Sequence, residues 1–564
     1  MTQSTDAYRV LGKLIGNTGD PMKLQVALKD SFSARRGEFV RILHQENRSQ
    51  DPLPVLGRIV SVSRSNVLFS EAVGEGLAEL TLLPGTRVTG ETIRATLELV
   101  GYMDPASGQP RIPRRPLDPG SEVLGVDFEF LREFYRFDPN YSIHLGNLVG
   151  YERGPNTVPV FLDVNKLATE HVAVLAMTGA GKSFAVGRLI ERMVALHNAS
   201  VIVFDPHGEY GRAFKGGTVQ FSGAEASTED ERDRVQLPKV RQNIDSLCQK
   251  DGRGIVVYTP DMAEFRTKYA GKNKTLALAL DQFDLDEFGA VLPGLSEPQQ
   301  RVLDAALRFW IKTTNPPRAA DSLLSFLTDK LGELQDWEEL SEAESNALNA
   351  RSAAVVAIRL RRLINESKSF YCTGMDSPLD AKGMVGRPSD AGGRLVIIDL
   401  QGISDSARQI IVALLSTEIL NASFDKSDPI RPVFLVYEEG HNFAPAGASS
   451  LSKNIIKRIA SEGRKFGVGF VIVSQRPSKL DADVTSQCNT LIVMRLKNPD
   501  DQNFIVKASD MLSRHDIDEL PALSTGEALV SGRSIPAPLL IRVGAKALQH
   551  GGESPDVLKE WNPQ

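Results

Sequence analysis

The stretch HVAVLAMTGAGKSFAVGRLIERM, residues 171–193, decides the fold. Its first part, Val172 to Ala176, is a short apolar run of the kind found in strands buried on both faces of a sheet. A helical pattern follows, with apolar residues every three or four positions. These residues are Phe184, Val186, Leu189, Ile190 and Met193. A glycine-rich turn between such a strand and such a helix predicts a phosphate-binding loop (P-loop).

The turn matches the pattern G-x-x-x-x-G-K-[ST], except that Ala176 replaces the first glycine. Two glycines permit backbone angles that aim several N–H groups at one anion. The residues predicted to bind ATP are Thr178, Gly179, Ala180, Gly181, Lys182 and Ser183. Lys182 would reach the β- and γ-phosphates, and the Ser183 hydroxyl would bind Mg²⁺. The alternative is an ordinary glycine-rich turn.

Composition sets the wider limits. The chain has 564 residues, with 65 Lys and Arg against 71 Asp and Glu. This length exceeds one ordinary domain, and the slight acidity argues against non-specific coating of nucleic acid, although a basic lining could be confined to a channel. Three scattered cysteines favour a reducing cytoplasm without disulfides. Without an apolar run of transmembrane length or a signal peptide, we expect a cytoplasmic protein with no membrane contact.

The chain divides by its patterns. Short alternating segments such as 78–82 and 92–99 predict a small β-barrel or sandwich that serves as an assembly module. Farther along, apolar strands alternate with helices, which predicts a mostly parallel α/β sheet. The expected domains are 1–150 (barrel plus linker), 151–545 (ATPase, including a mainly helical insertion at 215–390) and 546–564 (tail). Residues 217–237 are polar and predict a loop.

Three apolar strands end in acids, at Asp205, Asp399 and Glu438–Glu439. Nucleotide hydrolysis needs an acid that holds Mg²⁺ and a base that activates water. Only the last strand supplies two adjacent carboxylates, so we assign Glu438 to the metal and Glu439 to catalysis. Asp399 is the alternative metal residue, because Asp is usual in that role. The turn 205–210, DPHGEY, has Asp-x-His-x-Glu spacing that could hold a transition metal, although a polar turn beside the nucleotide is preferred.

Two further side chains suit the catalytic centre. Gln475 ends the next strand, where its amide could sense the γ-phosphate or position water. Arg464 lies between two glycines after a helix, which suits an arginine presented to a neighbouring subunit's nucleotide. Arg476 and Arg458 are the alternatives for that role, and a solvated surface arginine is the simplest interpretation of each. Lys453 and Lys457 predict a solvated helix face, or phosphate contacts if they line a pore.

Several ordered motifs together resemble the HerA family of hexameric DNA translocases, relatives of FtsK and of the conjugative coupling ATPases. The motifs are His171 with MTGAGKS (177–183), DPHGEY (205–210), YEEGHNF (437–443), EGRK (462–465), SQRP (474–477) and SQCNT (486–490). They lie within residues 125–545. Paired glutamates are familiar in that family, which supports Glu438 in the metal role.

The resemblance implies an N-terminal β-barrel and a RecA-like P-loop ATPase core with a helical insertion. It also implies a homo-hexameric ring around double-stranded DNA, with ATP and Mg²⁺ between subunits and Arg464 acting in trans. Strands near 526–530 and 539–543 would reach toward a neighbour. A bacterial member would work with a separate nuclease or sirtuin-like effector, in DNA-end processing or antiviral (anti-phage) defence.

Two other functions remain open. The first is a nucleotide-stabilised ring scaffold that regulates an effector with little DNA translocation, which Ala176 and the acidic charge favour slightly. The second is a conjugative or secretion coupling motor, against which the missing membrane anchor counts. Stimulation of the ATPase by DNA distinguishes the motor from the scaffold.

Overall fold

The computed structural model describes residues 9–30, 34–46, 51–66, 91–138, 140–151, 157–217, 219–223, 230–250, 254–260, 273–276, 288, 291–292, 294–315, 320–367 and 380–549. The packing of the backbone separates two compact units. The first comprises 1–137, 147–161 and 535–539, and the second comprises 138–146, 162–534 and 540–564. The predicted strand at 78–82 and most of the predicted tail lie outside the described residues. The predicted boundaries at 150 and 545 stay predictions.

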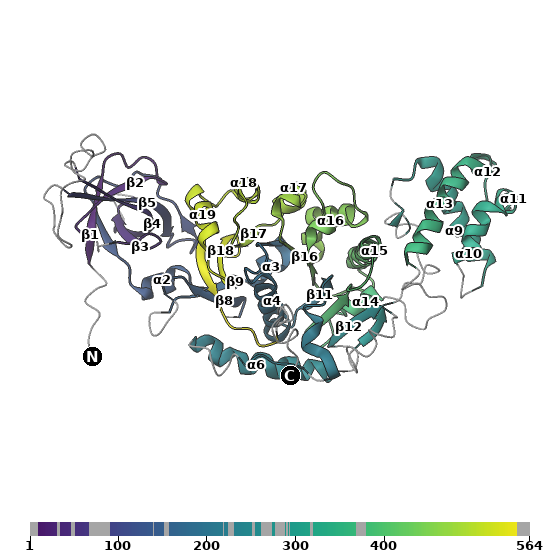
Figure 1. The fold of residues 1–564 in the computed structure, drawn as a ribbon, viewed down its shortest axis with the longest axis horizontal. Helices are drawn as coiled ribbons and strands as arrows, with labels where there is room; N and C mark the ends of the chain where they lie inside the picture. Colours follow the sequence, from purple (N-terminus) through teal and green to yellow (C-terminus); the bar gives the residue numbers. More distant parts are fainter. Residues whose placement is uncertain are drawn as a thin grey trace, which may run out of the picture. The chain divides into compact units, whose positions relative to one another are not determined.

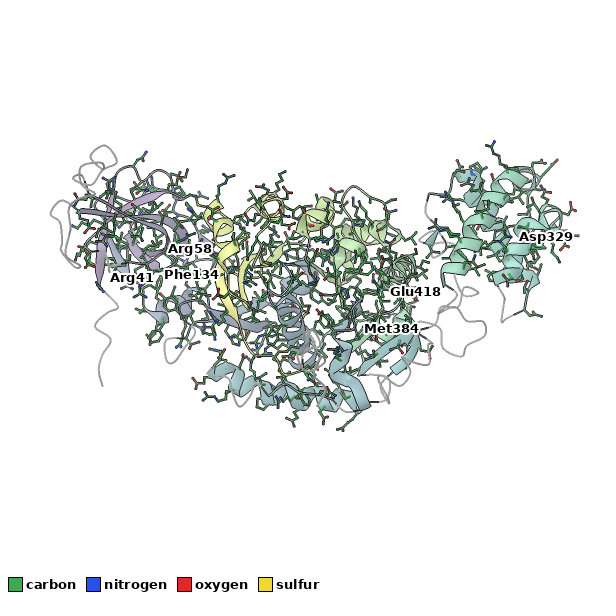
Figure 2. The ribbon with its side chains drawn as sticks, viewed as in Figure 1. Arg41, Arg58, Phe134, Asp329, Met384 and Glu418 are labelled. Carbon is green, nitrogen blue, oxygen red and sulfur yellow. The ribbon has the colours of Figure 1, made fainter. Side chains whose placement is uncertain are left out.

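Six strands of the first unit close into a β-barrel, in the order β1-β7-β3-β4-β5-β2, with β2 pairing back to β5 (Figure 1). The strands are β1 (Val10–Ile15), β2 (Leu24–Leu28), β3 (Phe39–His44), β4 (Leu53–Asn66), β5 (Glu91–Met103) and β7 (Glu122–Gly125), with a short β6 (Pro110–Arg111) beside β5. Closure removes exposed sheet edges, and the alternating inward side chains fill the interior. Arg58 of β4 (labelled in Figure 2) pairs with Glu98 of β5 at 3.4 Å, and both are nearly buried. Helix α2 (Phe128–Phe134) follows the barrel. The predicted barrel is therefore present, and β5 contains the strand predicted at 92–99.

A separate twelve-stranded sheet has the order β13-β12-β14-β11-β15-β16-β10-β17-β18-β19-β8-β9. It is parallel from β13 to β17, and β18 is antiparallel to β17. The strands are β8 (Ser142–Leu148), β9 (Pro159–Asp163), β10 (Val172–Leu175), β11 (Ser200–Asp205), β12 (Ile255–Pro260), β13 (Asn273–Leu276), β14 (Arg394–Asp399), β15 (Val433–Tyr437), β16 (Val468–Ser474), β17 (Thr490–Met494), β18 (Glu527–Gly532) and β19 (Leu539–Val543). The central strands are buried along their whole length, as continuous apolar runs require.

The helices of the second unit begin and end as follows: α3 (Val164–Glu170), α4 (Lys182–His197), α6 (Glu231–Cys248), α9 (Glu297–Thr313), α10 (Ala320–Thr328), α11 (Leu331–Gln335), α12 (Glu342–Ala347), α13 (Ala350–Ser367), α14 (Ala381–Val385), α15 (Asp405–Phe424), α16 (Leu451–Glu462), α17 (Ala482–Ser486), α18 (Pro499–Ala508) and α19 (Arg514–Glu519). Helix α4 packs with α6, α15 packs with α16, and α9, α10 and α13 pack together. Among the described helices, none is both long enough and apolar enough to cross a membrane.

One difference from the sequence-based expectations concerns residues 217–237. Helix α6 begins at Glu231, so the end of the loop predicted over 217–237 is helical. The carboxylate of Asp230 caps this helix, and its polar surface had concealed its start. Strands β12 and β13, within the region predicted as a mainly helical insertion, pair in the twelve-stranded sheet, and helices α9 to α13 follow them in the chain.

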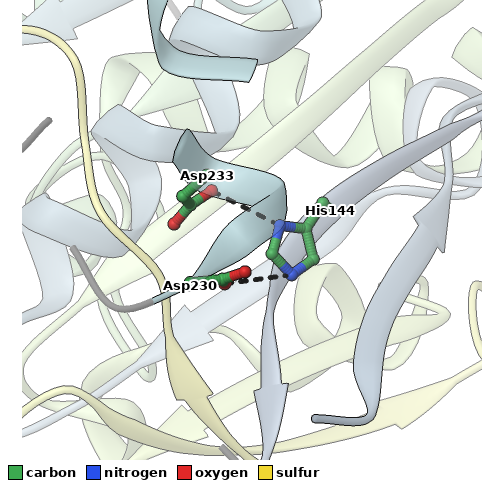
Figure 3. A group of neighbouring side chains, drawn as sticks. All are labelled: His144, Asp230 and Asp233. Atoms are coloured by element: carbon green, nitrogen blue, oxygen red, sulfur yellow. Dashed lines mark ion pairs between the residues drawn. The ribbon is translucent and has the colours of Figure 1, made fainter. Parts of the chain in front are cut away.

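A buried charged cluster holds α4, α6 and the segment after β19 together. Asp233 of α6 binds Arg188 at 2.8 Å and Arg192 at 2.7 Å, and it accepts the backbone N–H of Ala545 at 2.7 Å. His144 of β8 lies 3.4 Å from the same carboxylate (Figure 3). Burial would raise the pKa of Asp233, but the hydrogen bond with His144 and the charge and hydrogen bond of Arg188 hold that pKa far below its usual range. The guanidinium groups of Arg188 and Arg192 already bind the Asp233 carboxylate. The cluster is therefore an ion-pair network and does not fit a metal site.

Removing the central charge should therefore destabilise the fold strongly. Asp233→Ala would leave Arg188 and Arg192 buried without their carboxylate, which typically costs about 3–5 kcal/mol of unfolding free energy. Urea denaturation measures this loss. Asp245→Ala on the exposed face of the same helix is the matched control and should change stability by less than about 0.5 kcal/mol. Equal effects of the two substitutions would contradict the assigned role of the network.

Candidate ATPase site

The turn between β10 and α4 has the geometry of an anion-binding loop. Gly179 and Gly181 have φ angles of 76° and 101°, which residues with side chains rarely adopt. The turn is fixed from both sides, because Met177 N–H donates to the carbonyl of Arg495 at 2.9 Å and Gly526 N–H donates to that of Ala180 at 3.1 Å. Helix α4 begins at Lys182 and directs its positive end toward the loop. These features suit a bound phosphate group.

Ala176 needs no unusual backbone conformation. It is not among the described residues with positive φ, and its N–H donates to the carbonyl of Ser474 at 3.2 Å. Alanine therefore serves in place of the usual first glycine. The departure from the loop pattern has no visible structural cost.

Lys182 joins the two acids that follow β15. Its ammonium lies 2.8 Å from Oε1 of Glu438 and 2.8 Å from Oε1 of Glu439. Burial alone would lower the pKa of Lys182, but the two carboxylates outweigh it and raise that pKa. Burial raises the pKa of Glu438, whereas for Glu439 the nearby Lys182 ammonium outweighs burial and lowers the pKa. Glu439 is therefore held ionised, as a base requires.

A left-handed residue explains how both glutamates reach one lysine. Successive side chains of a strand point to opposite faces, so adjacent acids would normally diverge. Glu439 has φ 52° and ψ 46°, which turns the backbone just after β15. Such a conformation costs about 1–3 kcal/mol and is typically found at functional sites. Gly440 follows because a Cβ there would lie 2.3 Å from Ile472.

Gln475 and Thr178 complete the contacts around Glu439. The Gln475 amide donates to Glu439, and the Thr178 hydroxyl donates to the Gln475 oxygen. His441 lies 3.4 Å from Glu439 and 3.1 Å from the Ser474 hydroxyl. Gln475 thus connects the P-loop with the predicted base, which is the arrangement needed to report the γ-phosphate.

Two hydroxyl groups contact Glu438, the acid assigned to the metal, in addition to Lys182. The Ser183 hydroxyl donates to Glu438 Oε1 at 3.3 Å, and the Tyr210 hydroxyl donates to Oε2 at 3.1 Å. A hydroxyl and a carboxylate at adjacent positions are hard oxygen ligands of the type that Mg²⁺ prefers, so these residues fit that ion. The sequence prediction did not include Tyr210 among the site residues, although the DPHGEY motif after a buried strand was its signal.

The turn after β11 carries this tyrosine. Asp205 accepts the backbone N–H groups of Glu209 and Tyr210 at 3.1 and 2.9 Å. Burial raises the pKa of Asp205 to about 7. Its carboxylate is thus used in shaping the turn, and His207 of the same motif is exposed. The geometry favours the polar turn over the transition-metal alternative.

The alternative acid lies elsewhere. Asp399 accepts the N–H of Gln401 at 3.0 Å in its own turn. Strand β11 separates β14 from β15, which places Asp399 about 10 Å across the sheet from Glu438. Glu438 is therefore the better-placed metal residue.

The three arginines considered for the trans role lie at three different places in the fold. Arg464 lies in the turn η7 (Gly463–Phe466) before β16, its side chain is 58% exposed, and it lies 3.4 Å from Glu170. Arg476 follows Gln475 at the P-loop edge and is exposed. Arg458 pairs with Glu462 at 3.3 Å and covers the ring of Phe424, as an ordinary surface arginine does.

The two lysines of α16 are engaged within their own chain. Lys453 binds Asp481 at 2.7 Å and the carbonyl of Pro445 at 2.8 Å. Lys457 binds Asp483 at 2.7 Å and Asp481 at 3.1 Å. These contacts favour a structural role for both lysines over a role in a pore.

Known proteins are similar to this chain over most of its length. The family described as "Helicase HerA, central domain" matches residues 143–419. The DNA double-strand break repair helicase HerA of Pyrococcus furiosus is 28% identical, over 95% of this chain and 94% of its own. That of Saccharolobus solfataricus is 26% identical, over 98% and 95%.

The chain belongs to the HerA family of P-loop ATPases. Its core is the RecA-like sheet that the resemblance implied, with the P-loop strand β10 separated from the acidic strand β15 by β16. Among solved structures, the bacterial conjugative coupling protein TrwB is similar with a TM-score of 0.49 and 15% identity, over 76% of this chain and 95% of that one.

The tyrosine contact generates a prediction. Tyr210→Phe removes one hydrogen bond to a buried carboxylate, worth about 1–2 kcal/mol. The Mg²⁺ concentration for half-maximal ATP hydrolysis should rise by roughly tenfold. Tyr437→Phe is the matched control, because that buried hydroxyl pairs with Ser416 at 3.0 Å and not with the acids. An unchanged Mg²⁺ requirement in Tyr210→Phe would show that Tyr210 does not contribute to the metal site.

Proposed function

We propose that this HerA-family ATPase is an ATP-driven DNA translocase or helicase. It would act as a homo-hexameric ring around double-stranded DNA. Relatives named as DNA double-strand break repair helicases align over nearly the whole chain, which supports the DNA substrate. A separate nuclease or sirtuin-like effector would use the motor in DNA-end processing or anti-phage defence. A separate partner is expected because no nuclease motif is evident in the sequence.

The proposed chemistry uses the residues at the P-loop edge. The backbone of 178–183 and Lys182 would hold the phosphates of ATP, and Ser183 and Glu438 would hold Mg²⁺. The metal would neutralise charge between the β- and γ-phosphates. Glu439 would accept a proton from the attacking water, and Gln475 would orient that water.

One observation carries the proposal of a ring. The P-loop and Glu439 lie at the carboxyl end of the parallel strands, whereas Arg464 precedes β16 and lies at the amino end. Strand β16 has seven residues and spans roughly 20 Å. Arg464 therefore cannot reach its own subunit's phosphates. Its use as a catalytic arginine requires a neighbouring copy, which supports Arg464 over Arg476.

The scaffold alternative has less support than the sequence suggested. The conformation of Ala176 is ordinary, and the contacts among Lys182, Glu439 and Gln475 are those expected of a hydrolase. A ring that binds ATP with negligible, DNA-insensitive turnover would nevertheless favour it.

ATP hydrolysis by the purified protein, measured with and without linear double-stranded DNA, tests the motor. We expect a hexamer-sized particle whose turnover rises several-fold with DNA. Lys182→Ala should abolish ATP binding, because the ammonium that meets the phosphates is lost. The same rate of ATP hydrolysis with and without DNA would contradict a motor that acts without a partner protein.

Subunit mixing tests the trans arginine. Arg464→Ala should keep ATP binding and assembly but lose roughly 10³-fold in turnover, the scale of a missing catalytic arginine. Glu439→Gln should be inactive for another reason, the missing base. Particles containing both variants should regain activity where an intact Glu439 meets a neighbour's intact Arg464. No recovery would contradict catalysis in trans.

A further inference from the structure

A second exposed arginine shares the carboxylate that binds Arg464. Arg464 Nη2 lies 3.4 Å and Arg533 Nη1 lies 3.7 Å from the same atom, Glu170 Oε1. The arginine side chains are 58% and 62% exposed, whereas that of Glu170 is only 8% exposed. One buried negative charge thus holds two guanidinium groups at the surface. The net charge of the three groups is positive, which suits an approaching anion.

The backbone of Arg533 is fixed to the same corner. Arg533 N–H donates to the carbonyl of Asn489 at 3.0 Å, and Asn489 N–H donates to the carbonyl of Glu170 at 3.0 Å. Gly532 has φ 114°, and a Cβ there would lie 1.9 Å from the Asn489 oxygen. The chain can therefore turn sharply after β18 and present Arg533 from a rigid base.

The backbone of Arg464 is fixed in a similar way. A Cβ on Gly463 would lie 2.4 Å from the carbonyl oxygen of Val468, so the turn is closely packed. His171, directly after Glu170, stacks on Phe470 with ring centroids 4.2 Å apart and accepts that residue's N–H at 3.3 Å. This histidine ends helix α3 and directly precedes β10, the strand that leads to the P-loop.

Neither arginine can serve its own nucleotide. Arg533 follows β18, whose last residue Gly532 is paired with Thr490, the first residue of β17. It therefore lies at the amino end of the parallel strands, with Arg464. The four residues of β10 run from this end of the sheet to the P-loop and span about 13 Å.

We propose that Arg533 is a second trans-acting arginine, which binds the nucleoside triphosphate of the neighbouring copy together with Arg464. Glu170 is the positioning residue that holds the pair. The proposal rests on the proposed function, in which Arg464 acts in trans. Each guanidinium offers a planar fork of donors, so two forks can hold oxygens of two phosphate groups at once.

The test combines Arg533→Ala with Lys182→Ala in one particle, by co-expression under different tags. Alone, Arg533→Ala should assemble and bind ATP but turn it over roughly 10²-fold more slowly, the scale of losing one donor to developing charge. Mixed particles should regain activity, because Lys182→Ala subunits supply Arg533 to intact P-loops. Arg301→Ala is the matched control. That arginine of α9 is 61% exposed and binds the exposed Glu297 at 2.5 Å, so its loss should leave turnover unchanged.

Glu170→Gln tests the positioning role, because it keeps the shape of the side chain and removes its charge. We expect kcat to fall while the Kd for ATP stays unchanged, since the cis P-loop is untouched. If Arg533→Ala fails to assemble, Arg533→Lys replaces it, retaining the charge but not the fork, and should still lower kcat.

Arg464→Ala is mixed with Lys182→Ala in the same way, so that the two proposals can be separated. If this mixture regains activity, the proposed function stands. The role of Arg533 is then overturned if Arg533→Ala alone keeps full turnover, or if its own mixture with Lys182→Ala does not regain activity. Failure of both mixtures would overturn catalysis in trans altogether. Loss of ATP binding in Glu170→Gln would show that Glu170 supports the fold of the P-loop strand and would overturn its positioning role.

Discussion

The ATPase site depends on one constraint, the meeting of the Lys182 ammonium with two consecutive carboxylates. Three charged groups in a buried place are costly unless their geometry is well matched. Here the lysine starts a helix and both acids end a strand, so rigid elements fix all three. The left-handed backbone of Glu439 is the cost of this arrangement, and it is repaid only if both carboxylates are needed at the same place. The site therefore suits a ligand that needs a lysine and two carboxylates at the same place.

The same constraint explains the neighbouring strands. Gln475 can contact Glu439 because β16 lies directly beside β15, and it can contact Thr178 because β10 lies on the other side of β16. The strand that carries the amide is therefore inserted between the strand of the P-loop and the strand of the acids. A phosphate that moved Thr178 would also affect the position of Glu439, because the side chain of Gln475 contacts both residues.

The sequence predicts much of this site because its signals are local. Buried strands appear as continuous apolar runs, and the polar residue after each run lies at the edge where ligands bind, which predicts Glu438, Glu439 and Gln475. The glycine-rich loop pattern predicts Lys182. What could not be predicted depends on contacts between distant segments. Tyr210 reaches Glu438 only through the turn that Asp205 caps, and the positive φ of Glu439 has no pattern in the sequence. The start of α6 was missed because its buried residue is an aspartate whose arginine partners lie on another helix.

The two ends of the parallel strands have different tasks, and this difference bears on how such a protein could couple its sites. The carboxyl end gathers the nucleotide-binding groups, and the amino end presents Arg464 from a rigid, glycine-flanked turn. Both ends belong to the same strands, β10 and β16, which run directly from one to the other. A displacement of the P-loop by a phosphate would therefore be carried along a stiff, fully buried strand pair to the corner at His171 and Glu170. In the proposed ring, that corner would face the next nucleotide, and the sheet itself would supply a mechanical path between successive sites.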